Sequence, residues 1–73
     1  MVFELGKYYK HTTYHYLYVC GVVNSHAYGM GLIAESIHKG RNVEFMVVGS
    51  DENSSVNYTG ITKEEYMETC FSE

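Results

Sequence analysis

The sequence predicts a small, mostly β protein of the α+β class: an antiparallel SH3-like barrel or curled sheet of four to five strands with one C-terminal helix. Short segments with alternating apolar side chains recur along the chain, and seven glycines separate them at intervals of roughly 8–12 residues. A helix-capping sequence near residue 62 predicts the helix. At 73 residues the chain has room for one domain, which we assign to residues 1–73.

The N-terminal half is expected to hold three strands. Lys7–His11 alternates aromatic and basic residues and predicts a short strand, and residues 12–15 are expected to turn. Tyr14–Val23 is rich in β-branched and aromatic residues and has two partly apolar faces, so it predicts a central strand. Residues 24–29 have the composition of a loop, and Leu32–Glu35 predicts the third strand.

The C-terminal half is expected to hold two further strands. Residues 38–42 form a polar turn before Val43–Val48, a fourth strand that should make a hairpin with the third. Residues 49–55 are expected to be a polar loop, and residues 56–59 a short fifth strand.

The helix is predicted to begin after Thr62, because Thr62-Lys63-Glu64-Glu65 is a capping box. The Thr62 hydroxyl can accept from the Glu65 amide, and acidic residues in the first turn complement the positive end of the helix dipole. Apolar residues then recur at spacings of three and four, which predicts a stripe that docks on the sheet: Tyr66, Met67, Cys70 and Phe71.

The predicted core takes one face of the strands and one side of the helix: Leu17, Val19, Ile33, Val43, Phe45, Val47 and Phe71. The two cysteines are isolated in sequence and too few for a disulfide framework. We expect Cys20 and Cys70 to be free thiols that are mostly buried as small apolar side chains.

Composition excludes several classes of function. The net charge is -4 with only five Lys and Arg residues, which argues against nonspecific nucleic-acid binding. The acidic excess lies in the second half of the chain, where it forms either a solvated acidic helix and loop or an acidic patch that steers toward a basic partner. No apolar run reaches the ~20 residues of a membrane span, and the first residues lack a secretory pattern. We therefore expect no membrane association and a cytoplasmic location.

The residue types that carry chemistry do not form a recognisable catalytic or metal motif. His11 and His15 are four residues apart but fall in a predicted strand-turn-strand, and His26 and His38 follow at wide spacing. Zinc sites need three or four ligands at recognisable spacing, and neither C-x-x-C nor G-x-S-x-G is present. We predict a non-enzymatic protein with no catalytic residue, metal or cofactor.

The eight tyrosines indicate where a partner would bind, since tyrosine adds contact area at low entropic cost. The leading surface is the Lys7–Tyr18 hairpin with the adjacent loop, represented by Tyr8, His11, Thr13, Tyr14, His15, Tyr16 and Tyr28. The second surface is the acidic, amide-rich segment represented by Asp51, Asn53 and Asn57. The competing interpretation is that the tyrosine rings only cover the sheet, with the helix docked over them.

Four sequence blocks occur in a fixed order: K-x-Y-x-H-T-T at residues 7–13, V-G-x-D at 48–51, N-Y at 57–58 and I-T-x-E-E-Y at 61–66. In this order they resemble a group of short phage and prophage proteins, and the resemblance covers nearly the whole chain. Such proteins carry a small flexible residue after H-T-T where this chain has Tyr14, which leaves the turn type open. The resemblance implies a small accessory protein of a mobile element in a bacterial host.

Three functions remain open at this point. The first is an interaction protein that binds and inhibits a host defence component, as an anti-CRISPR or other anti-defence inhibitor. The second is a homo-oligomer that sequesters a small nucleotide signal, and the third is a structural or assembly component of a phage. The partner is accordingly a host protein or complex in the first case and a nucleotide in the second.

Overall fold

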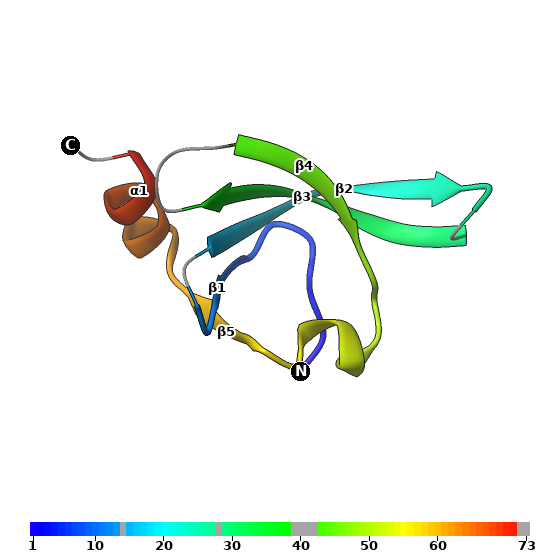
Figure 1. The fold of residues 1–73 in the computed structure, drawn as a ribbon, viewed down its shortest axis with the longest axis horizontal. Coiled ribbons are helices and arrows are strands. Elements are labelled where there is room, and N and C mark those ends of the chain that lie inside the picture. Colours follow the sequence, from blue (N-terminus) through cyan, green and yellow to red (C-terminus); the bar gives the residue numbers. More distant parts are fainter. Residues whose placement is uncertain (14, 28, 39–42, 72–73) are drawn as a thin grey trace.

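A computed structural model describes residues 1–13, 15–27, 29–38 and 43–71 (Figure 1). The described strands form one open antiparallel sheet in the order β4-β3-β2-β1-β5, so the predicted mostly β fold is confirmed as a curled sheet and not as a closed barrel. The elements in chain order are β1 (Tyr8–His11), β2 (His15–Ser25), β3 (Gly29–His38), β4 (Val43–Val48), the 3₁₀ helix η1 (Glu52–Ser55), β5 (Tyr58–Ile61) and α1 (Lys63–Phe71).

The strand predictions hold best where the alternation of side chains is strongest. β2 is central, as expected, and β4 has the predicted bounds and forms the predicted hairpin with β3. The fifth strand was misplaced: it runs over Tyr58–Ile61 and not 56–59, because it pairs with β1 from His11 to Tyr8. The predicted polar loop contains η1, whose first turn is capped by the Asp51 carboxylate at 3.0 Å from the Ser54 amide.

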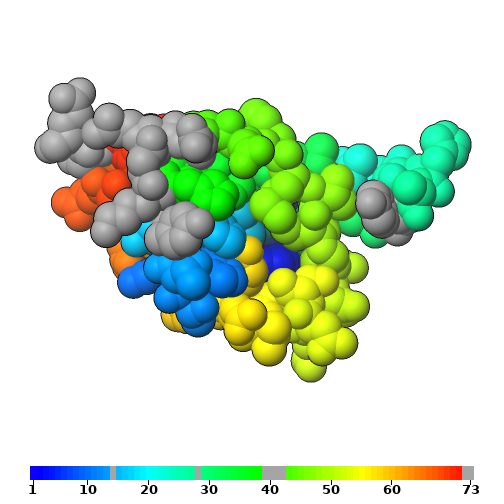
Figure 2. All heavy atoms as spheres, in the orientation of Figure 1, coloured from blue at the N-terminus to red at the C-terminus, as the bar shows by residue number. Residues whose placement is uncertain are grey.

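The β2–β3 hairpin is longer than the sequence predicts. The expected loop at residues 24–29 is mostly strand, since β2 continues to Ser25 and β3 begins at Gly29, whose φ of 76° suits a tight turn. A β-bulge between Val19 and Gly21 shifts the register of the pair. Beyond it, an arm (residues 22–27 and 29–31) projects from the molecule at the end opposite α1, which gives the fold extents of 39 × 22 × 20 Å (Figures 1 and 2).

The core lies on one face of the sheet and includes a residue that no strand supplies. The N-terminal segment starts beside η1, where the Ser55 hydroxyl donates to the Met1 carbonyl, and then turns back into β1 (Figure 1). It inserts Phe3, whose ring makes edge-to-face contacts with Tyr9 at 4.9 Å and Tyr58 at 5.0 Å. The buried cluster comprises Phe3, Tyr9, Leu17, Val19, Ala34 and Val48.

The opposite face carries α1. Tyr66 is 1% exposed, and its hydroxyl donates to the Glu35 carboxylate of β3 at 2.8 Å. Its ring also contacts Tyr8 of β1 at 5.0 Å. Because the helix has nine residues, it covers only the part of the sheet around these contacts.

Several predicted core residues are exposed, which corrects the predicted core. Only Leu17 and Val19 are buried, and Ile33 is half-buried. The side chains of Val43, Phe45 and Val47 are 52%, 68% and 43% exposed, because β4 is an edge strand that α1 does not reach. On α1 only Tyr66 of the predicted stripe is buried; Cys70 is half-buried, and Met67 and Phe71 are exposed.

The two thiols are free, as predicted, but neither is buried, so the prediction that both are mostly buried was wrong. Cys20 is exposed because it is the extra residue of the β-bulge. Cys70 is half-buried on α1, and this burial, with the nearby Glu35 carboxylate, raises the pKa of its thiol.

The helix cap gives a first test. The Glu65 amide donates to the Thr62 hydroxyl at 3.0 Å, as the capping box predicts. Thr62→Ala should therefore lower the free energy of unfolding by about 1 kcal/mol, which lowers the melting temperature of a domain this small by roughly 4–8 °C. Thr69→Ala, in the exposed helix interior, is the control and should not lower it. Equal melting curves for Thr62→Ala and the wild type would contradict the cap.

A second test concerns the N-terminal segment. Phe3→Ala should cost about 3–5 kcal/mol, because it leaves a cavity between Tyr9 and Tyr58. A domain of this length has a total stability of roughly 4–11 kcal/mol, so the variant should be largely unfolded in circular dichroism at room temperature. Leu5→Ala is the control, because Leu5 is 56% exposed in the same segment. A cooperative transition unchanged in Phe3→Ala would rule out this role.

Candidate binding site

The hairpin between β1 and β2 brings two histidines together. The register pairs Lys10 with Tyr16, so His11 and His15 occupy the next opposed positions on either side of the turn. Side chains opposed in an antiparallel pair lie on the same face of the sheet. The two imidazole rings stack at a centroid distance of 4.5 Å and an interplanar angle of 15°.

Strand pairing extends this pair into a row across four strands. On one side His11 is opposite Tyr58 of β5, with ring centroids 4.9 Å apart. On the other side His15 is opposite His38 of β3, at 5.1 Å. We call these four side chains, Tyr58, His11, His15 and His38, the ring row; all four are half-buried.

Hydrogen bonds fix the orientation of two of the imidazoles. The Thr13 amide donates to Nδ1 of His11 at 3.2 Å, and the Thr13 hydroxyl is 2.8 Å from the same nitrogen. The hydrogen bond from the Thr13 amide requires a lone pair on Nδ1 of His11. The imidazole of His11 therefore carries its proton on Nε2. Nε2 of His15 is 2.7 Å from the Tyr58 hydroxyl, a bond that joins β2 to β5 across β1.

The environment of the ring row disfavours charge. Burial lowers the pKa of His15, and the neighbouring His11 and His38 lower it further, since a second positive charge would repel the first. Burial also raises the pKa of the Tyr58 phenol. The row therefore offers a partner ring faces and neutral hydrogen-bonding groups.

The second predicted surface meets the first at one residue. The Thr12 amide donates to the Asn57 carbonyl at 3.0 Å, which holds the hairpin turn against the segment that precedes β5. Asp51 and Asn53 belong to η1 and are exposed. Bonds from Ser54 lower the pKa of the Asp51 carboxyl, so this group is a cap as well as a surface charge.

The described tyrosines of the predicted site do not lie on the face of the ring row. Tyr8 and Tyr16 lie on the face that carries α1, opposite to the ring row. Tyr8 stacks on Tyr18 at 4.7 Å and contacts Tyr66 of the helix, and it is half-buried. Tyr14 and Tyr28 lie outside the described residues, and their roles stay predictions.

Two members of the ring row were not among the predicted site residues. His38 was assigned to a polar turn, and Tyr58 to a short strand without a partner. Each joins the row only through its cross-strand neighbour, His15 or His11. No local pattern indicates such a pairing, because the paired residues lie far apart in the sequence. His11 and Tyr58, for example, are 47 residues apart.

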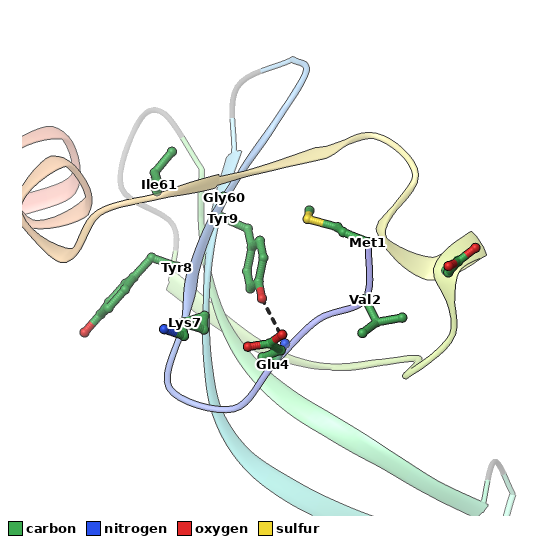
Figure 3. A pocket seen from close by; sticks show the side chains of 9 residues that line it. Met1, Val2, Glu4, Lys7, Tyr8, Tyr9, Gly60 and Ile61 are labelled. Carbon is green, nitrogen blue, oxygen red and sulfur yellow. Dashed lines mark hydrogen bonds between the residues drawn. The ribbon is translucent and has the colours of Figure 1, made fainter.

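Two grooves open elsewhere on the surface. One, of 450 Å³, lies between the N-terminal segment and β5, where the Glu4 amide donates to the Tyr9 hydroxyl (Figure 3). Its wall carries charges of both signs from Glu4, Lys7 and Glu52, and Tyr8 is the predicted site residue that the described part of the chain contributes to it. The other groove, of 520 Å³, is apolar and lies where β3 and β4 meet the arm; it is lined by Met30, Gly31, Val47, Val48 and Gly49.

A metal site needs several side chains whose lone pairs point to one common position. Within the described ranges no group of three or more His, Cys, Asp or Glu side chains is arranged to hold a metal ion. The stacked imidazoles turn their faces toward each other, and Nδ1 of His11 and Nε2 of His15 are already in hydrogen bonds.

Among the helices in the described part of the chain, none has the length and apolarity to span a bilayer.

Comparison with protein families, with curated proteins and with solved structures finds no match to this chain. The functional conclusion therefore rests on the chemistry of the site and on its charge.

The lowered pKa of His15 predicts an acid-sensitive fold. As the pH falls below about 6.5, the unfolded chain takes up a proton at this residue before the folded chain does. The stability that this difference supplies is complete above that pH and is lost as the pH falls toward the lower, folded pKa. The melting temperature should thus fall between about pH 7.5 and pH 5.5.

The variant His15→Gln should flatten this dependence relative to the wild type. His26→Gln is the matched control, because His26 is exposed and lies in the turn of the arm, away from the ring row. An identical slope for the wild type and His15→Gln would show that His15 is not the titrating group.

Proposed function

We propose that this protein is a non-enzymatic binding protein whose recognition surface is the ring row with the adjoining Thr12–Thr13 turn. The observation that carries the proposal is the alignment of three imidazoles and one phenol on one face, beside a turn whose residues are exposed. Aromatic groups with a polar edge supply both contact area and directed hydrogen bonds, which is why they dominate interface energetics.

The charge around this surface favours a basic partner. From Asp51 onward the chain carries six acidic residues and one lysine. Two of these acids, Asp51 and Glu52, are exposed on η1, in the segment that Asn57 joins to the turn. Acidic groups exposed on the same molecule speed the encounter with a positively charged protein and disfavour polyanions.

The proposed partner is a component of a bacterial host's defence, which this protein inhibits in the cytoplasm as an anti-CRISPR or other anti-defence protein. The resemblance to short phage proteins suggests this context. Two of the four sequence blocks have an evident structural role: V-G-x-D caps η1 through Asp51, and I-T-x-E-E-Y caps α1 through Thr62. The other two, H-T-T and N-Y, meet in space at the ring row.

The test has two stages. The protein is first expressed in a panel of bacterial strains that each carry one defence system, and plaques of a phage sensitive to that system are counted. We expect plaques to be restored in one strain. The tagged component of that system is then titrated with the purified protein by calorimetry.

The variants His11→Ala and His15→Ala should weaken this binding at least about tenfold while circular dichroism shows the fold intact. His26→Ala, exposed and distant from the ring row, should bind as the wild type does. Restoration of plaques in no strain would reject the anti-defence role. Wild-type affinity in both ring-row variants would reject the surface.

One observation favours sequestration of a nucleotide signal as the second candidate. The near-parallel stack of His11 and His15 forms a flat aromatic group at the end of the sheet, and such groups can continue into a stack with a base. Native mass spectrometry of protein purified from infected cells separates the two. A bound mass of a few hundred daltons favours the nucleotide, and a co-purified macromolecule favours the inhibitor.

A further inference from the structure

The two edges of the sheet differ in a way that bears on self-association. β5 is an edge of four residues with Gly60 in its interior, whereas β4 is an edge of six residues. Sheet edges of monomers are normally protected by short length, lysine, proline or a bulge. β4 has none of these, since its sequence is Val-Glu-Phe-Met-Val-Val and no register shift interrupts its pairing with β3.

One face of β4 is apolar and uncovered. Val43, Phe45 and Val47 alternate along the strand, and Phe45 shares a row with Glu35, Tyr18 and Tyr8 on the face that carries α1. The helix covers Tyr8 but leaves Phe45 68% exposed. Apolar surface continues past the end of β4 into the 520 Å³ groove at the base of the arm.

The total surface is also large for a monomer. A folded monomer of this size exposes roughly 4,600 Å², whereas this chain exposes 5061 Å². The projecting arm and the uncovered face of β4 both add to this surface.

We propose that β4 pairs with β4 of a second copy of this chain, antiparallel about a twofold axis at Phe45, to form one continuous ten-stranded sheet. In this register Phe45 lies opposite its own copy, and Val43 lies opposite Val47 of the other chain. A twofold axis perpendicular to the sheet keeps both α1 helices on one face. The three exposed apolar side chains of each copy then form a single cluster between the helices.

Charge disfavours one of the two neighbouring registers that also keep like faces together. Glu44 is the only charged residue of β4. A shift by one pair in one direction would put Glu44 directly opposite Glu44 of the other copy, which is destabilising. With the axis at Phe45, Glu44 lies opposite Met46, and the two carboxylates are offset along the strands by two residues, about 7 Å.

The size of the interface sets its strength. A standard stable interface covers roughly 800 Å² per partner, and a six-residue edge is small beside this. We therefore expect a dimer that dissociates on dilution. Sedimentation equilibrium from roughly 1 μM to 1 mM should show a shift from one to two chains.

Matched variants locate the contact. Phe45→Glu should be monomeric at every concentration, because it sets two carboxylates against each other on the axis. Val56→Glu is the control: Val56 is 74% exposed and lies between η1 and β5, at the other edge of the sheet. It should dimerise as the wild type does, and all three proteins should have the same circular dichroism.

A thiol crosslink tests the register. In a Cys20→Ser, Cys70→Ala background, Phe45→Cys should form a disulfide-linked dimer on mild oxidation, whereas Glu44→Cys should not. A wild-type protein that stays monomeric at 1 mM overturns the proposal. It does so even if the β4 edge binds a strand of another protein instead. The proposal is equally overturned by a dimeric Phe45→Glu, by a monomeric Val56→Glu, or by crosslinking through residue 44 in place of 45.

Discussion

The contact on which most of the structure depends is the edge-to-face packing of Phe3 against Tyr9 and Tyr58. A sheet of five short strands needs a cover on each face, and the chain has only one α-helix in its described part. The N-terminal segment supplies the second cover by placing one aromatic ring in the core. This ring holds β5 against β1, and the same Tyr58 then completes the ring row through its bond to His15. The core and the candidate binding surface thus share a residue.

The two covers are unequal, and the difference shapes the outer surface. On the helix face one buried residue, Tyr66, joins the helix to β3 through Glu35 and to β1 through Tyr8. Nine helical residues cannot reach β4 as well, so the apolar side chains of that strand face solvent. In a larger protein a second helix would cover them. Here the uncovered edge strand is left for the proposed contact with a second copy of this chain, and it lies apart from the ring row.

The ring row illustrates how neutral groups can form a recognition surface in an acidic protein. The three imidazoles lie side by side, and at His15 burial and the two neighbouring imidazoles lower the pKa. The row thus offers ring faces and hydrogen-bonding groups, and a positive charge at His15 is disfavoured. The same arrangement makes the fold sensitive to acid, because His15 must take up its proton against burial and against the neighbouring rings.

The sequence by itself determined the features that depend on neighbouring residues. Alternation over Val43–Val48 gave the bounds of β4, and the Thr62 capping box placed the start of α1, because both are set by contacts within a few residues. Only the tertiary structure decided which parts of the two sheet faces are covered. As a result Phe3 is buried and Phe45 is exposed. It also decided that His38 and Tyr58 join His11 and His15. The pairing of β1 with β5 is a contact between distant segments, and its register is set by packing of the whole sheet, which no local pattern encodes.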